Sequence, residues 1–295
     1  MRRAALPIAS TFVFALSILP AQGQGDARSE LLRQINDERA RAGAPLLQLD
    51  GRLNQAAQRH AEEIARRGAL RDVGEGTEEE LKRAGYNAHA WGVNTTVTTQ
   101  SLAGLLRHWR TENSGSWWKL MDAEYRDLGI GVSRLRDTPL YVFFYAVPKE
   151  DHFARATVGL RDPDQVRARM LAAVNAVRKR AGLRLLKADP ELDRAAQAHA
   201  EDMLRRSYFD HESPSGTTVR ERSRSAGYDW RTIGENIAEG QLSVDEVMDT
   251  WMRSPGHRKN ILNPDFRELG LGLAAGRSPK GEYRVTWVQN FGTPR

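Results

Sequence analysis

The 295-residue chain contains no cysteine, which excludes disulfide bonds, cysteine-ligated metal sites and thiolate nucleophiles. It also lacks a long apolar run after residue 19, so no later segment is predicted to cross a membrane. The formal net charge is only +6, and the basic residues are spread over both halves among Asp and Glu. That distribution is typical of solvated helix faces, and we predict no nucleic-acid partner. The 28% charged and 40% hydrophobic composition indicates a globular protein, long enough for two domains.

The first residues have the pattern of a secretory signal peptide. Arg2-Arg3 is a basic start, residues 4–19 are largely apolar, and Ala21-Gln22-Gly23 offers small residues at a cleavage position. An uncleaved membrane anchor is the alternative, because the apolar run approaches the length that spans a bilayer. Two prolines in the region favour cleavage. We therefore expect residues 1–23 to be removed and the mature protein to be secreted, periplasmic or extracellular.

The remaining sequence consists of two copies of one unit. The segment Ala56–Glu62, AAQRHAE, recurs as AAQAHAE at Ala195–Glu201, 139 residues later. After small length differences, LGIG at Leu128–Gly131 matches LGLG at Leu269–Gly272. Self-similarity over such distances indicates a tandem duplication.

The two copies are predicted to form domains over residues 27–150 and 165–295. Each begins with two amphipathic helices and continues with short helices. One of the short helices opens at a capping-box signal, Thr77 with Glu80 in the first copy and Thr218 with Glu221 in the second. Each ends with segments rich in β-branched and aromatic residues, which predict an antiparallel hairpin. Helices gathered on an antiparallel sheet define an α+β fold class.

Three short motifs in the second copy are chemically distinctive: Asp210-His211-Glu212, Gly234-Glu235-Asn236 and SPGHRKNIL at Ser254–Leu262. With the closing WVQNFG at Trp287–Gly292, they resemble the CAP superfamily. This SCP-like family comprises cysteine-rich secretory proteins, antigen 5 and pathogenesis-related proteins. The chain is most similar to a compact, cysteine-free bacterial type. The resemblance implies that each domain is an α-β-α sandwich.

The resemblance also implies a central cleft with two histidines and two acidic residues, able to hold zinc or another divalent metal. On the matching positions, His211 and His257 would be the histidines and Glu235 one of the acids. The place of the second acid is taken by Arg253-Ser254, and Glu212 is a carboxylate that could substitute for it. The spacing alone is long and irregular, so a structural alternative stands beside the metal site: the two histidines could satisfy buried backbone groups.

The duplication provides an internal control on these residues. The aligned positions of the first copy, Asp72, Val93 and Ser116, carry none of the three side chains. The residues that mark the fold do recur: Gly92, Asn94, Trp109 and the glycines at 129 and 131. The residues needed for folding are therefore kept and the chemical ones lost. This favours a functional role for the motifs and marks the first copy as degenerate.

Three functional hypotheses follow. We expect a secreted binding module, rather than an enzyme, that uses Glu212 and Glu235 beside a metal to hold a small molecule, lipid, peptide or envelope polymer. The alternative is a metal-assisted, peptidase-like hydrolase, with Glu235 as the catalytic general base toward a polarised water. A third possibility is a structural or interaction protein of the cell envelope in which the cleft plays no part.

Overall fold

The computed structural model describes residues 21–70, 74–112 and 114–295. Two compact units follow one another, divided between His152 and Phe153, and we call them unit 1 and unit 2. Most of the predicted signal peptide lies outside the described residues, as does Asp72, the first-copy counterpart of His211. Among the helices that are described, none is long and apolar enough to cross a membrane.

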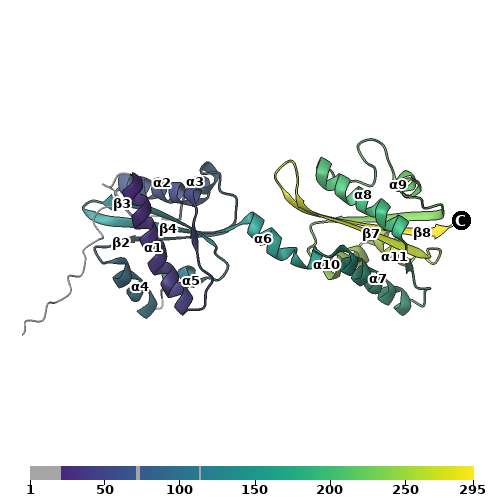
Figure 1. The fold of residues 1–295 in the computed structure, drawn as a ribbon, viewed down its shortest axis with the longest axis horizontal. Helices are drawn as coiled ribbons and strands as arrows, with labels where there is room; N and C mark the ends of the chain where they lie inside the picture. The colour runs from purple at the N-terminus through teal and green to yellow at the C-terminus, as the bar shows by residue number, and fades with distance from the viewer. Residues whose placement is uncertain (1–20, 71–73, 113) are drawn as a thin grey trace, which may run out of the picture. The chain divides into compact units, whose positions relative to one another are not determined.

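Both units have the same order of elements (Figure 1). Unit 1 contains α1 (Ala21–Arg41), β1 (Gln48–Leu49), α2 (Gly51–Arg67), α3 (Thr77–Arg83), β2 (Ala88–Val97), α4 (Leu102–Thr111), α5 (Gly115–Met121), β3 (Asp127–Leu135) and β4 (Thr138–Pro148). Helix α6 (Lys149–Ala156) contains the division, and a 3-10 turn, η1 (Val158–Leu160), follows it. Unit 2 continues with α7 (Pro163–Arg180), β5 (Lys187–Ala188), α8 (Pro190–Arg206), α9 (Val219–Ser225), β6 (Trp230–Glu239), α10 (Val244–Arg253), α11 (Pro255–Ile261), β7 (Glu268–Arg277) and β8 (Tyr283–Pro294).

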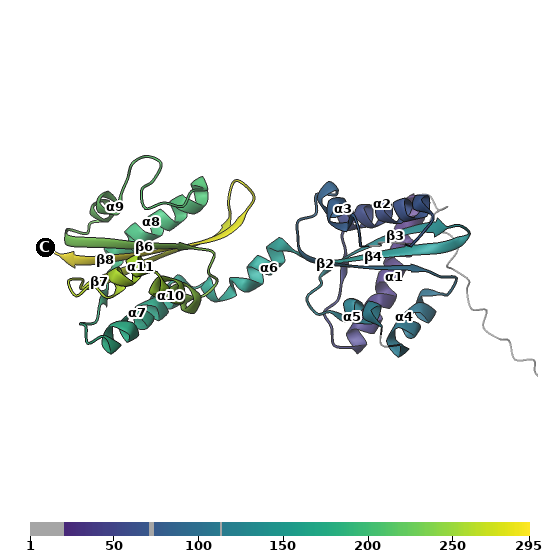
Figure 2. The ribbon, with the colours of Figure 1, turned by 180° about the vertical axis from the view of Figure 1, so that it is seen from behind.

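Each unit is a three-layered sandwich around a four-stranded sheet. The strand orders are β1-β3-β4-β2 and β5-β7-β8-β6, and only the short first strand of each sheet runs parallel to its neighbour. In unit 2, α7, α10 and α11 cover one face of the sheet and α8 and α9 the other (Figure 2). This confirms the predicted α+β class and tandem α-β-α architecture. Strands β2 and β6 were not predicted, and β6 carries Glu235.

The repeated glycines are explained by close packing of a helix on the sheet. A Cβ atom added to Gly270 would lie 2.2 Å from the backbone of α8, and one added to Gly272 would lie 2.1 Å from it. Gly129 and Gly131 meet α2 in the same way. Because no side chain fits, these helices rest directly on strand backbone, and the LGxG pattern persists in both copies.

The capping-box prediction is correct for one copy and wrong for the other. Thr218 and Glu221 form the box at the start of α9. In unit 1, Gly76 takes the N-cap position with a φ of 77°, so Thr77 is already inside the helix and its hydroxyl donates to the Gly74 carbonyl. The carboxylate of Glu80 instead accepts from Arg59.

A buried arginine fixes the end of α11 in unit 2. Arg178 is fully buried, and its guanidinium donates to the carbonyls of Ile261 and Asn263 at 2.8 and 2.9 Å. Arg39 makes the equivalent contacts with the end of α5 in unit 1. Satisfying the final carbonyls of the short helix holds it in place, and in unit 2 that helix carries His257.

Candidate functional site

Glu235 is the centre of the candidate site. It lies on β6, opposite Asn290 of β8, with only 3% of its side chain exposed. Its Oε1 accepts from His211 Nδ1 at 2.8 Å, and its Oε2 accepts from Arg222 Nη2 at 2.6 Å. With its amide oriented to satisfy both neighbours, Asn290 donates to Oε2 at 3.3 Å and accepts from the Ala196 N–H. The carboxylate is thus buried but fully compensated, as a buried charge must be.

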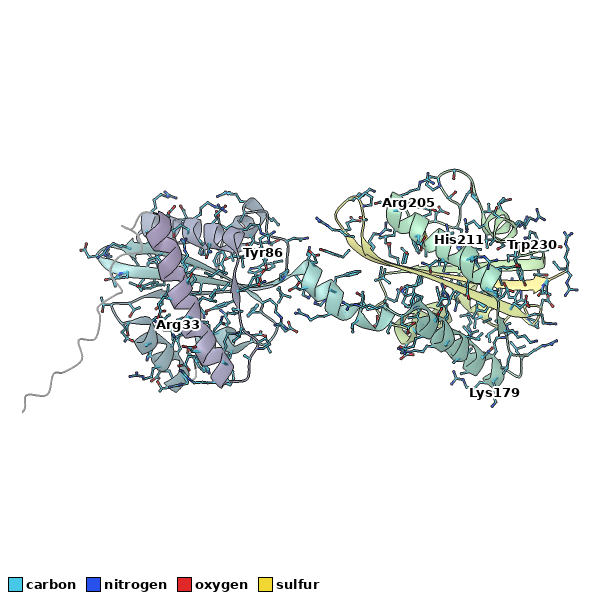
Figure 3. The ribbon with its side chains drawn as sticks, in the orientation of Figure 1. Arg33, Tyr86, Lys179, Arg205, His211 and Trp230 are labelled. Carbon is cyan, nitrogen blue, oxygen red and sulfur yellow. The ribbon has the colours of Figure 1, made fainter. Side chains whose placement is uncertain are left out.

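His211 is the exposed member of the site. It lies in the loop between α8 and α9, and 56% of its side chain is accessible (Figure 3). The hydrogen bond to Glu235 raises the pKa of its imidazole, an effect that exceeds the opposing effect of burial. Arg222 also donates to the His211 carbonyl at 3.0 Å. The loop is therefore fixed through main chain and side chain, and the imidazole keeps its Nε2 edge away from Glu235.

His199 lies behind the carboxylate on α8. Its side chain is 1% exposed, and Nε2 lies 4.0 Å from Glu235 Oε1 and 3.0 Å from the Asp210 carbonyl. Burial is the main cause of the lowered pKa of its imidazole. The contact between His199 Nε2 and the Asp210 carbonyl holds the loop that contains His211 against α8, so His199 has a structural role.

His257 approaches the site from the opposite layer, on α11. Its carbonyl accepts from Asn236 Nδ2 at 3.1 Å, and Asn260 Nδ2 donates to the Glu235 carbonyl at 3.0 Å. These two amides join α11 to β6. Burial lowers the pKa of the His257 imidazole, and the charge of His211 lowers it further. The Nδ1 atom of His257 is buried and has no hydrogen-bond partner within the described chain.

The structure brings His211 and Glu235 into direct contact and leaves Glu212 apart from them. Glu212 is exposed, and a Cβ atom added to Gly216 in the same loop would lie 3.5 Å from its Oε1. The side-chain hydrogen-bond partners of the Glu235 carboxylate are His211, Arg222 and Asn290. The role of Glu212 as the second acid stays a prediction.

The predicted three-ligand metal site does not fit this geometry. Across the described ranges, no group of three or more His, Asp or Glu side chains is placed to hold a metal ion. Both oxygens of Glu235 already accept strong donors. Two imidazole features remain: His257 Nδ1 is buried with no hydrogen-bond partner among the described residues, and Glu235 orients the His211 ring. Carboxylate–imidazole pairs of this kind commonly support metal-ligating histidines from outside the coordination sphere.

Sequence reasoning missed Arg222, Asn260 and Asn290. Arg222 belongs to the run VRERSRS, which looks like a solvated helix, yet 9% of its side chain is exposed. Its burial depends on Glu235, which is distant in sequence. Only Asn260 could have been found from the sequence, because it belongs to the SPGHRKNIL motif and lies on α11 together with His257.

Unit 1 has an apolar contact where unit 2 has the carboxylate. Val93 occupies the position of Glu235 and lies opposite Phe144, which occupies that of Asn290. Phe144 is buried in the core beneath α2, and Val93 packs against this core. Asn94 still donates to the Ser116 carbonyl, as Asn236 does to that of His257. Unit 1 thus keeps the hydrogen bond from the strand asparagine to the helix, but apolar packing takes the place of the Glu235 carboxylate and its partners.

Comparison with known proteins places both copies in one family. The model described as "CAP: Cysteine-rich secretory protein family" matches residues 32–147 and 171–291, which confirms the resemblance drawn from the motifs. Two proteins of Bacillus subtilis (strain 168) are similar in sequence. The uncharacterized protein YkwD is 40% identical over 123 residues, 42% of this chain and 45% of YkwD. The uncharacterized membrane protein YlbC is 33% identical over 122 residues, 41% of this chain and 33% of YlbC.

The chain spans less than half the length of these two curated relatives. Among solved structures, an extracellular protein containing an SCP domain from Bacillus anthracis str. Ames matches with a TM-score of 0.40 and 20% identity, over 73% of this chain and 70% of that one.

Proposed function

The chain belongs to the cysteine-rich secretory protein (CAP) family, and from this premise we propose that it is an exported binding protein whose second domain carries the ligand site. The observation that carries the proposal is the compensated carboxylate of Glu235. It is held by His211 and Arg222, and 3% of its side chain is exposed. Such a group orients its neighbours rather than reacting, and the exposed surface of the site is the His211 imidazole.

A binding role is favoured over hydrolysis by the same geometry. A general base must reach the proton of the attacking water, whereas both oxygens of Glu235 accept hydrogen bonds from protein groups. If the protein were a hydrolase, His211 would have to act as the base, with Glu235 fixing its tautomer. Substitution of Glu235 by Gln would then reduce turnover without abolishing it.

A divalent metal is part of the proposal, with a smaller ligand set than the motifs implied. The imidazoles of His211 and His257 would hold the ion, and Glu235 would orient His211 from outside the coordination sphere. Zinc suits imidazole ligands and tolerates water in the remaining positions. The ion would supply an open coordination position for a donor atom of the ligand.

Zinc titration of the full chain by calorimetry tests this proposal. The H211A/H257A variant should lose the binding event, while the control variant H89A/H152A, which removes two histidines of unit 1, should retain it. Equal binding by wild type and both variants would contradict the proposed ligand pair. Hydrolysis of a protein substrate by wild type that H211A abolishes would instead favour the enzymatic alternative.

Export is proposed from the signal-peptide pattern of residues 1–23, and the Bacillus anthracis relative is described as extracellular. Cleavage near Gly23 would remove the first residues of α1, which begins at Ala21. Mass spectrometry of the protein recovered outside the cell should find a chain that begins close to Gln24. Recovery of intact chain in the membrane fraction would favour the uncleaved anchor.

A further inference from the structure

Two arginines of α9 lie over one tryptophan where the chain leads from α9 into β6. Arg224 and Arg220 place their guanidinium carbons 4.9 and 5.9 Å from the centre of the Trp230 ring. Trp230 Nε1 donates to the Arg220 carbonyl at 3.4 Å, and Arg231 follows directly in the chain. We call Arg220, Arg224, Arg231 and Trp230 the α9 arginine patch. Its three arginines are exposed.

The arginines of this patch lack a carboxylate at ion-pair distance in the part of the chain that the structure describes. Within the described residues, none of its arginines forms an ion pair, whereas exposed Arg205 and Arg253 of the same unit are each paired with an aspartate. The neighbouring carboxylates are engaged elsewhere: Glu221 accepts from Thr218, and Asp229 lies 3.6 Å from Arg295. The guanidinium groups therefore keep their N–H donors available.

Stacking on Trp230 prepares these arginines for anions. A guanidinium over an indole ring is held by cation–π attraction, and its in-plane N–H groups still point outward. Arg220 and Arg224 are four residues apart on a helix, so they lie on the same face. Carboxylate and phosphate groups match the planar fork of a guanidinium and bind it in bidentate fashion.

Unit 1 shows that the fold does not need this patch. The C-caps Ala84 and Ala226 align α3 with α9, and on that alignment Glu78 and Lys82 replace Arg220 and Arg224. Glu78 and Lys82 form an ion pair with each other at 2.7 Å. The Trp230 position holds Ala88. At these two positions the helix thus carries an ion pair in one copy, and two arginines that form no ion pair among the described residues in the other.

We propose that the α9 arginine patch binds a linear polymer that bears repeated carboxylate or phosphate groups. The three arginines extend from the helix into the strand, which suits a row of anionic groups better than one small anion. The patch and the His211 site use different faces of α9, because Arg222, two residues from both Arg220 and Arg224, turns toward Glu235 instead. The two proposals are independent, since the patch includes none of the His211, Glu235 or His257 side chains.

The test compares two triple variants of the full chain that change the net charge equally. R220Q/R224Q/R231Q removes the patch, and R169Q/R180Q/R184Q removes three other exposed arginines of unit 2. Immobilised polyphosphate and polygalacturonate serve as the probes, with neutral dextran as the blank, and affinity is measured at low and at high salt. Circular dichroism establishes that both variants are folded.

We expect the patch variant to bind about tenfold more weakly or worse, and the control variant to change less than about threefold. Binding to polyphosphate alone would identify phosphate as the recognised group, and binding to polygalacturonate alone would identify carboxylate. R220K/R224K keeps the charge but lacks the planar fork, so it should bind more weakly than wild type. Equal losses in the two triple variants, or no binding to either probe, would overturn the proposal.

Discussion

The buried pair of Arg222 and Glu235 makes a quantitative prediction about stability. Replacing Arg222 by Met removes the donor to Glu235 Oε2 and leaves the carboxylate in a site where 3% of its side chain is exposed. Removing one partner of a buried ion pair costs about 3 kcal/mol, because the other charge is left uncompensated. The R222M variant should therefore lose about 3 kcal/mol of unfolding free energy in unit 2.

The structure supplies a matched control in unit 1. Arg59 and Glu80 form a pair of similar length, 2.6 Å, but their side chains are 32% and 14% exposed. More exposed pairs contribute at most about 1 kcal/mol, so R59M should cost far less than R222M. The double variant R222M/E235Q removes both charges and should recover about 1–2 kcal/mol relative to R222M alone.

Hydrogen exchange measured by mass spectrometry separates the two units. Peptides from β6 to β8 report on unit 2, and peptides from β2 to β4 report on unit 1 within the same sample. A loss of about 3 kcal/mol should accelerate exchange of the slowest amides in unit 2 about a hundredfold, with unit 1 unchanged. A cost for R222M no larger than that of R59M would refute the account of Glu235 as a buried charge that needs this arginine.

Two further predictions concern packing and protonation. Gly272→Ala should destabilise unit 2 by about 3 kcal/mol or more in a thermal melt, because the new methyl group would overlap the α8 backbone. The control Gly256→Ala, whose added methyl group meets no atom within 4 Å, should be neutral or stabilising. Similar melting temperatures for the two variants would contradict this packing. In chelated buffer, NMR should find His211 titrating above the ordinary histidine pKa of about 6.5 and His257 below it. The stability from His211 is then present below its unfolded pKa and lost as pH rises through the folded pKa, whereas that from His257 is present at higher pH and lost on acidification. Glu235→Gln should lower the pKa of His211 toward its ordinary value, and the pKa of His257 should stay below its ordinary value because burial is the main cause of its shift. Coincident titration of the two rings in the wild-type protein would contradict the assigned partners.

The sequence allowed correct predictions where the residue type itself depends on the local packing. The glycines at 270 and 272 recur in the first copy because the helix–strand contact excludes any side chain. The motifs around His211, Glu235 and His257 indicated the family, and the family implied the sandwich. These inferences required only short patterns and their order.

The parts that were not predicted depend on tertiary partners. Strand β6 has no simple alternation, because Glu235 and Asn236 point polar groups into opposite layers where distant residues satisfy them. Arg222 lies in a helix of surface-like composition, and only the position of the carboxylate explains its burial. The Thr77 capping box failed because a left-handed Gly76 displaced the start of the helix by one residue.

The most direct test of the central claim is anomalous diffraction from crystals of the full chain soaked in zinc. The account predicts one strong peak bonded to the rings of His211 and His257, with the Glu235 carboxylate still contacting His211 and Arg222, and no corresponding peak at Val93 in unit 1. A peak bonded directly to Glu235, or no peak in unit 2, would contradict the proposed division between an ion-holding pair of histidines and an orienting carboxylate.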